Sequence, residues 1–168
     1  FDSAEPGGPD GQEQRDLWLV RTDGTGLTRL TETVADEEGP TVSPDGQRLA
    51  YSSDGDPLAG QQIYVRSLDG GTASRLTDPA DGTATEPVWN PVDDPAHRDL
   101  IAYTATATTS VDGQSVPQLR VTDGTTDGPL LGGAQEQWRA HGAAWLPDGT
   151  GVLFLSPEIT CECEGDWD

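Results

Sequence analysis

The chain has 168 residues, of which 21 are glycine, 13 are proline and 33% are hydrophobic, a composition typical of one domain built from short strands and tight turns. Its 30 acidic and nine basic residues give a formal net charge of −21, which repels phosphate backbones and argues against nucleic-acid binding. No window approaches the roughly 18 consecutive apolar residues of a membrane-spanning helix, so no membrane insertion is expected.

The first predicted unit is an apolar strand, an Asp-Gly turn and a closing Arg-Leu-Thr, read from DLWLVRTDGTGLTRLT at residues 16–31. The same pattern returns 46 residues later as QIYVRSLDGGTASRLT at residues 62–77. A third and weaker copy is QLRVTDGTTDGPLLGG at residues 118–133. Internal similarity at a fixed period is the signature of a repeat architecture.

A second predicted unit lies between these copies, at residues 38–53, 85–105 and 140–156. Each copy reads as a short strand, a turn containing proline and an apolar strand. Pro44 presets the backbone angle at the first corner of its turn, and Gly46 accepts the positive φ that a tight reversal often needs. These stretches therefore predict antiparallel hairpins.

Together the two units give four antiparallel strands, a to d, every 46 to 56 residues, which predicts an all-β fold of β-propeller blades. The rival β-sandwich gives no reason for hairpins to recur in register. We expect strands c and d of a first blade at 1–37, whole blades at 38–79 and 80–134, and strands a and b of a last blade at 135–168. About three blades cannot close a ring of four to eight, so the remaining blades are expected from missing chain or from self-association.

The stretch SPDGQRLAYSS…QQIYVRSLDGGTASRLT resembles the repeat of TolB-type propellers, which are relatives of WD-repeat proteins. The match runs through nearly all of residues 15–156, is strong at 39–77 and weakens where NPVDDPAHRDL replaces the compact turn. The resemblance implies an extracytoplasmic location, whether secreted, periplasmic or envelope-anchored, and recognition of a protein or peptide partner without catalysis.

Strand alternation sorts the connections between two faces of the ring. The a-to-b and c-to-d turns are expected on one face, and the longer b-to-c and d-to-a connections on the other. A binding site is expected on the long-loop face or in the central channel lined by the a strands. The long connections are residues 54–61, 78–85, 106–117, 133–140 and 157–168.

Two weak metal candidates fall on this face. Asp54 and Asp56 flank a glycine, as in calcium loops, but the further acidic positions of an EF-hand are missing. Cys161 and Cys163 would point to one side of an extended segment and supply half of a tetrahedral metal site, although a disulfide is the preferred interpretation. Apart from calcium at Asp54 and Asp56, no cofactor is expected.

Catalytic residues are not evident. His97 lies in an irregular turn and His141 begins the last strand a, and no Gly-x-Ser-x-Gly nucleophile motif accompanies them. We therefore expect the chain not to be an enzyme.

Four of the five tryptophans fall into two groups with different expected roles. Trp89 and Trp145 occupy the same register of strand a, which indicates a core role. Trp138 and Trp167 lie in long connections outside this pattern and are the candidate contact residues for a partner.

Three functions remain open on the sequence. The first is a non-catalytic TolB-like scaffold that binds a protein or peptide at the cell envelope or outside the cell. The second is the substrate-gating propeller of a prolyl-oligopeptidase-like serine peptidase whose catalytic domain lies elsewhere. The third is a structural subunit of a self-associating surface assembly.

Overall fold

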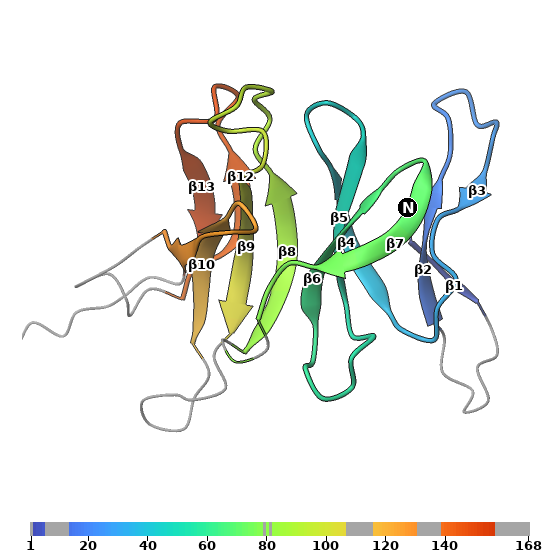
Figure 1. The fold of residues 1–168 in the computed structure, drawn as a ribbon, viewed down its shortest axis with the longest axis horizontal. Helices are drawn as coiled ribbons and strands as arrows, with labels where there is room; N and C mark the ends of the chain where they lie inside the picture. The colour runs from blue at the N-terminus through green and yellow to red at the C-terminus, as the bar shows by residue number, and fades with distance from the viewer. Residues whose placement is uncertain are drawn as a thin grey trace, which may run out of the picture.

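The computed structural model describes thirteen β-strands and no α-helix in residues 2–5, 14–78, 80, 82–106, 116–130 and 139–156. The strands form four successive sheets in which every paired neighbour is antiparallel. We name the sheets blades 1 to 4 in chain order; they stand side by side in Figure 1. Within the described residues, no helix has the length and apolarity needed to cross a membrane.

The two central blades each contain four strands in sequential order, which we call a to d. Blade 2 consists of β4 (Glu37–Val42), β5 (Arg48–Ser53), β6 (Gln62–Ser67) and β7 (Gly70–Arg75). Blade 3 consists of β8 (Thr83–Trp89), β9 (Ile101–Thr106), β10 (Pro117–Thr122) and β11 (Asp127–Pro129). The predicted fold class, a propeller of four-stranded antiparallel blades, is confirmed.

The outer sheets show parts of the same pattern. Blade 1 contains β1 (Asp2–Glu5), β2 (Gln14–Leu19) and β3 (Thr28–Arg29), so a strand b stands beside the expected strands c and d. Blade 4 contains β12 (His141–Trp145) and β13 (Val152–Leu155), which are strands a and b.

The recurring Pro-Asp-Gly turn is held by its own backbone. The amide of Gly46 donates to the carbonyl of Ser43 over 2.8 Å, and the amide of Ser43 donates to the carbonyl of Arg48 over 2.9 Å. Gly46 has φ 71° and Gly149, at the same place in blade 4, has φ 70°, a region that glycine enters without steric cost. The local sequence therefore specifies the a-to-b hairpins of blades 2 and 4.

The recurring Leu-Thr closes a blade at the start of strand c. In blade 2, Thr77 Oγ1 accepts a hydrogen bond from the amide of Ile63 at 3.0 Å and donates to Gln62 Oε1 at 2.7 Å. In blade 1, Thr31 Oγ1 accepts the amide of Leu17 at 2.8 Å. Buried amides need a partner, and the threonine hydroxyl supplies it where strand d has ended. This contact explains why the motif returns with the repeat.

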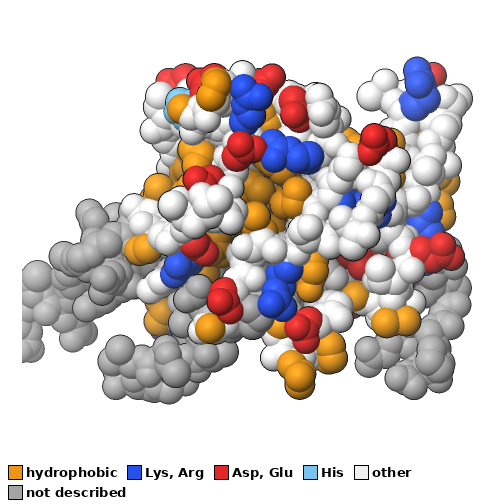
Figure 2. Space-filling model, in the orientation of Figure 1, with side chains coloured by type: hydrophobic (Ala, Val, Ile, Leu, Met, Phe, Trp, Pro, Cys, Tyr) orange, Lys and Arg blue, Asp and Glu red, His pale blue; other side chains and the backbone are white. Residues whose placement is uncertain are grey.

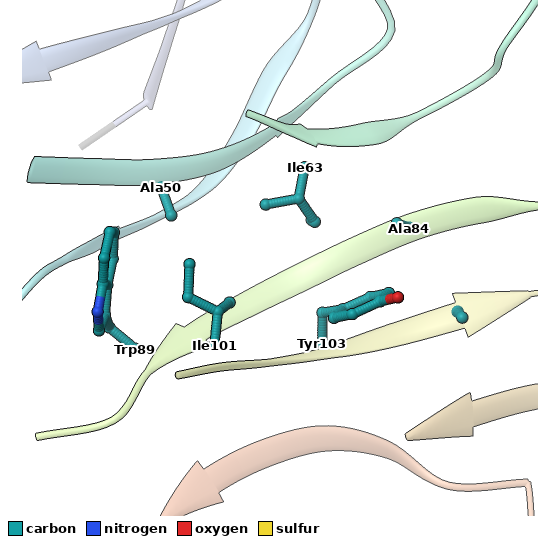
Figure 3. Packing of buried hydrophobic residues seen from close by; sticks show 7 residues of the cluster. Ala50, Ile63, Ala84, Trp89, Ile101 and Tyr103 are labelled. Carbon is teal, nitrogen blue, oxygen red and sulfur yellow. The ribbon is translucent and has the colours of Figure 1, made fainter. Parts of the chain in front are cut away.

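Hydrophobic side chains fill the space between blades 2 and 3 (Figure 3). Trp89, predicted as a core residue, is 5% exposed, and its indole Nε1 donates to the carbonyl of Arg98 at 2.6 Å. Each large side chain buried in this way stabilises the fold by about 1.5–3 kcal/mol. The core of this interface consists of Ala50, Ile63, Ala84, Trp89, Ile101, Tyr103 and Ala105.

Candidate functional site

The long connections gather at one end of the blades. In Figure 1 the β3–β4, β5–β6 and β7–β8 connections lie at the lower end, which we call the long-loop end, while turns 43–47 and 90–100 lie at the upper end. This arrangement agrees with the sorting expected from strand alternation. It places residues 54–61 beside the beginnings of the a strands.

Each strand a carries a bulge near the long-loop end. The register of β4 shifts between Glu38 and Thr41, and β8 and β12 shift at the corresponding places. The residue at the bulge has positive φ in all three blades, with 60° at Gly39, 54° at Glu86 and 66° at Gly142. Among the described residues, Glu86 is the only non-glycine with positive φ. Such a conformation is uncommon for a residue with a side chain and is often found at functional sites, which makes Glu86 a candidate site residue.

A polar pocket of about 290 Å³ opens beside two of these bulges, between blades 2 and 3. Its walls come from β4, β5 and β8 and from the residue that precedes β6. Two of its lining side chains are carboxylates and none is cationic. The lining residues are Glu38, Gly39, Ser52, Gln61, Thr85 and Glu86.

Hydrogen bonds hold the carboxylate of Glu86 in place. Its Oε2 accepts from Thr104 Oγ1 at 2.9 Å, within the same blade, and from the amide of Gly142 at 3.1 Å, in the next blade. The amide of Gly142 belongs to the neighbouring bulge. Glu86 therefore joins blades 3 and 4 while it lines the pocket.

The second pocket carboxylate, Glu38, lies on blade 2. Its Oε1 forms an ion pair with Arg15 Nη1, and its Oε2 accepts a hydrogen bond from Gln61 Nε2 at 3.4 Å. The Arg15 side chain is 49% exposed, so this ion pair lies largely in water and holds Glu38 weakly. The carbonyl of Gln61 accepts the amide of Ala84 at 2.8 Å, which ties the β5–β6 connection to blade 3.

The β5–β6 connection contains the two aspartates of the calcium hypothesis. Asp54 Oδ1 accepts the amide of Asp36 at 2.8 Å, whereas Asp56 caps the amide of Leu58 at 3.1 Å and pairs with Arg75 at 3.1 Å. Within the described residues no group of three or more His, Cys, Asp or Glu is arranged for a metal ion. Calcium at this loop stays a prediction.

The same connection exposes apolar surface at the long-loop end. Leu58 is 97% exposed, and Val34 in the neighbouring β3–β4 connection is 91% exposed. Figure 2 shows apolar side chains at the lower tip, over the β5–β6 connection. The pocket therefore lies close to a loop that offers hydrophobic contact.

A buried carboxyl group lies directly beside the pocket residue Glu38. Glu37 is 1% exposed; Thr33 Oγ1 donates to its Oε1 at 2.5 Å, and its Oε2 has no hydrogen-bond partner among the described residues. Burial raises the pKa of Glu37 above its ordinary value, and the negative charges of Asp16 and Asp54 raise it further, while the hydroxyl groups of Thr33 and Thr31 act in the opposite direction.

The next blade has no acidic residue at the position that corresponds to Glu37. Asp16 and Glu37 at the interface of blades 1 and 2 correspond to Gln62 and Ala84 at the next interface. Gln62 Nε2 donates to the carbonyl of Gly82 at 2.7 Å and so links its blade to the following one. The carboxylate of Asp16 lacks a donor for such a link, and it pairs with Arg29 instead.

The other predicted site residues are either distant or undescribed. His97 Nδ1 lies 2.9 and 3.0 Å from the two carboxylate oxygens of Asp94, in the turn at the upper end, away from the pocket. The hydrogen bond from His97 lowers the pKa of the Asp94 carboxyl. His141 begins β12, one residue before the third bulge.

Four candidate residues fall outside the described part of the chain. They are the tryptophans proposed as contact residues and the cysteines of the CxC motif: Trp138, Trp167, Cys161 and Cys163. Their roles stay predictions.

Sequence reasoning missed Glu38 and Glu86. One signal was available, because Gly39, Glu86 and Gly142 each stand five residues before the proline of the a-to-b turn. Prolines at 40 and 87, directly after the first two of these residues, also mark an interrupted strand. The glutamate concealed the pattern because the bulge position otherwise holds glycine.

Comparison with known proteins identifies partial relatives. The chain is 41% identical over 75 residues to the Tol-Pal system protein TolB of Geobacter sulfurreducens, a match that covers 45% of this chain and 16% of that protein. It is 36% identical over 75 residues to the uncharacterized peptidase YuxL of Bacillus subtilis, covering 45% and 11% of the two chains. No family model matches.

A solved structure shares the fold over a longer stretch. The putative TolB from Agrobacterium tumefaciens superposes with a TM-score of 0.65 and 22% identity, covering 86% of this chain and 47% of that one. The chain thus spans less than half the length of each of these three proteins.

Proposed function

We propose that this chain, a member of the TolB-like β-propeller repeat family, is part of a non-catalytic scaffold that binds a protein or peptide at its long-loop end. The observation that carries the proposal is the pocket of about 290 Å³ between β4 and β8, at the end where the long connections gather. Rigid scaffolds commonly present binding residues on such connections, and concave polar sites fix the orientation of a ligand.

Two further observations support binding. Leu58 and Val34 offer apolar contact at the long-loop end, and exposed apolar surface framed by polar residues is typical of interaction sites. The relative from Geobacter sulfurreducens is itself a component of the Tol-Pal system. The resemblance to TolB-type propellers also favours an extracytoplasmic location for this chain.

A selection experiment tests this function. The immobilised full chain is used to select binders from displayed random peptides, and the best binder is located by hydrogen–deuterium exchange. We expect protection of β4, β8 and residues 54–61, with turns 43–47 and 90–100 unchanged. A selection that yields no binder, or protection confined to those turns, would overturn the proposal.

A second function is favoured by the similarity to the peptidase YuxL. In that case the propeller is the substrate-gating domain of a prolyl-oligopeptidase-like serine peptidase. A Gly-x-Ser-x-Gly motif encoded downstream in the same reading frame, with peptidase activity of the full product that is lost when its serine is replaced, would support this function over the first.

A further inference from the structure

The ionisable residues that line the pocket between blades 2 and 3 are all acidic. Its two ionisable lining residues are Glu38, on β4 of blade 2, and Glu86, on β8 of blade 3. Among the described residues, one arginine forms an ion pair with a lining residue: Arg15 pairs with Glu38. The side chain of Arg15 is 49% exposed. The lining is therefore negative, and within the described residues its counter-charge is the half-exposed Arg15.

The carboxylate of Glu86 is oriented before any ligand arrives. Its Oε2 is held by Thr104 and by the amide of Gly142, whereas its Oε1 takes no hydrogen bond from the residues that the structure describes. A carboxylate held through one oxygen keeps the other available as an acceptor at little entropic cost. The pocket thus contains a pre-oriented anionic acceptor.

Blades 2 and 4 have glycine where blade 3 has Glu86. The two equivalent residues, Gly39 and Gly142, have the same positive φ and need no side chain to form the bulge. A glutamate at this place adopts a backbone conformation that its side chain disfavours. Thus the bulge does not require Glu86, and its carboxylate is the feature that distinguishes this interface.

The chemistry of the lining favours an organic cation over a metal ion. A metal site generally needs three or more protein ligands, and no such group is present in the described residues. An ammonium or guanidinium group needs only a few oriented acceptors, which Glu86, Glu38 and Thr85 can supply. A volume of about 290 Å³ also accommodates a long side chain.

We propose that the pocket receives a lysine or arginine side chain of the bound peptide, seated between Glu38 and Glu86. This inference rests on the proposed function and names the chemistry of its partner. The carboxylate pair recognises the cationic group, while the exposed Leu58 contacts an apolar part of the same peptide. The overall charge of −21 also favours the approach of a cationic partner.

The test uses a synthetic copy of the best-selected peptide and a second copy in which each lysine and arginine is replaced by glutamine. We expect the selected peptides to be enriched in lysine or arginine, and the replacement to weaken binding at least tenfold. Glu86→Gln should cause a similar loss with the unmodified peptide, because it removes the charge and keeps the shape of the side chain.

Two variants control for structural effects. Glu86→Gly should bind at least tenfold more weakly while its thermal unfolding stays close to that of the parent chain, because glycine relieves the cost of the positive φ and so offsets the lost hydrogen bonds to Thr104 and Gly142. Asp148→Asn removes one charge from the exposed turn between β12 and β13 at the upper end, and should leave binding within twofold of the parent value.

The outcomes separate this inference from the proposed function. Peptides that protect the long-loop end but lack lysine and arginine, or that bind Glu86→Gln as tightly as the parent chain, would overturn the cationic site and leave the scaffold function standing. A library that yields no binder at the long-loop end overturns both.

Discussion

Replacing Glu37 by glutamine should stabilise the protein at neutral and alkaline pH. The carboxyl group is 1% exposed, its Oε2 has no partner among the described residues, and Asp16 and Asp54 place negative charge near it. Leaving a buried polar atom unsatisfied costs about 1–3 kcal/mol, and more when the group is charged. Removing the charge should recover about 1–3 kcal/mol at pH 8.

The gain should depend on pH in a defined direction. The folded-state pKa of Glu37 lies above its ordinary value of 4.5, so the folded protein retains a proton that the unfolded chain releases. The stability linked to this proton is present below pH 4.5 and is lost as the pH rises through the folded pKa. Glu37→Gln should therefore match the parent chain at pH 4.5 and exceed it increasingly at higher pH.

Urea unfolding of the full chain at pH 4.5, 6 and 8, followed by tryptophan fluorescence, measures this difference. Glu38→Gln is the matched control, because Glu38 is adjacent and partly exposed and pairs with Arg15, so its replacement should give no gain at pH 8. If Glu37→Gln is no more stable than the parent chain at pH 8, the assignment of Glu37 as a buried acid with a raised pKa is wrong.

Two further predictions concern contacts that the repeat maintains. Gly149→Ala should lower stability by about 2–4 kcal/mol in urea unfolding, because its φ is 70° and the new Cβ would lie 2.6 Å from Asn90 Oδ1. Gly46 has the same turn position, but no atom lies within 4 Å of an added Cβ. Gly46→Ala should therefore lose only about 1–2 kcal/mol, which is what a positive φ costs an alanine. Equal losses of stability for the two variants would show that the contact with Asn90 does not destabilise Gly149→Ala. Thr77→Val should cost about 1–3 kcal/mol and accelerate amide exchange at Ile63, whose N–H loses its acceptor; unchanged exchange would refute this role.

The hairpins could be predicted from the sequence because their causes are local. Pro44, Gly46 and Gly149 specify turns within a few residues, and the strands between them alternate or are continuously apolar. The recurrence of Leu-Thr was visible, and the structure supplies its reason in the hydrogen bond from Ile63 to Thr77. Because these local motifs recur at a fixed period, the sequence alone predicts the succession of blades.

The site could not be predicted in the same way, because its properties depend on which blades meet. Glu37 and Glu38 are neighbours in the sequence, yet one is buried between blades and the other lines the pocket. Glu86 and Glu38 line the same pocket only because β8 packs beside β4. The two carboxylates lie 48 positions apart and carry no motif that joins them. Packing between blades, rather than local pattern, creates the pocket.

The most direct test of the account is an amide chemical-shift titration of the full chain with the selected peptide. The amide of Gly142 reports on Glu86 through their hydrogen bond of 3.1 Å, and Gly39 reports on the part of the pocket that β4 lines. We predict that both signals move with a common binding constant while Gly46 and Gly149 at the upper end stay fixed. Shifts confined to Gly46 and Gly149 would contradict a binding site at the long-loop end.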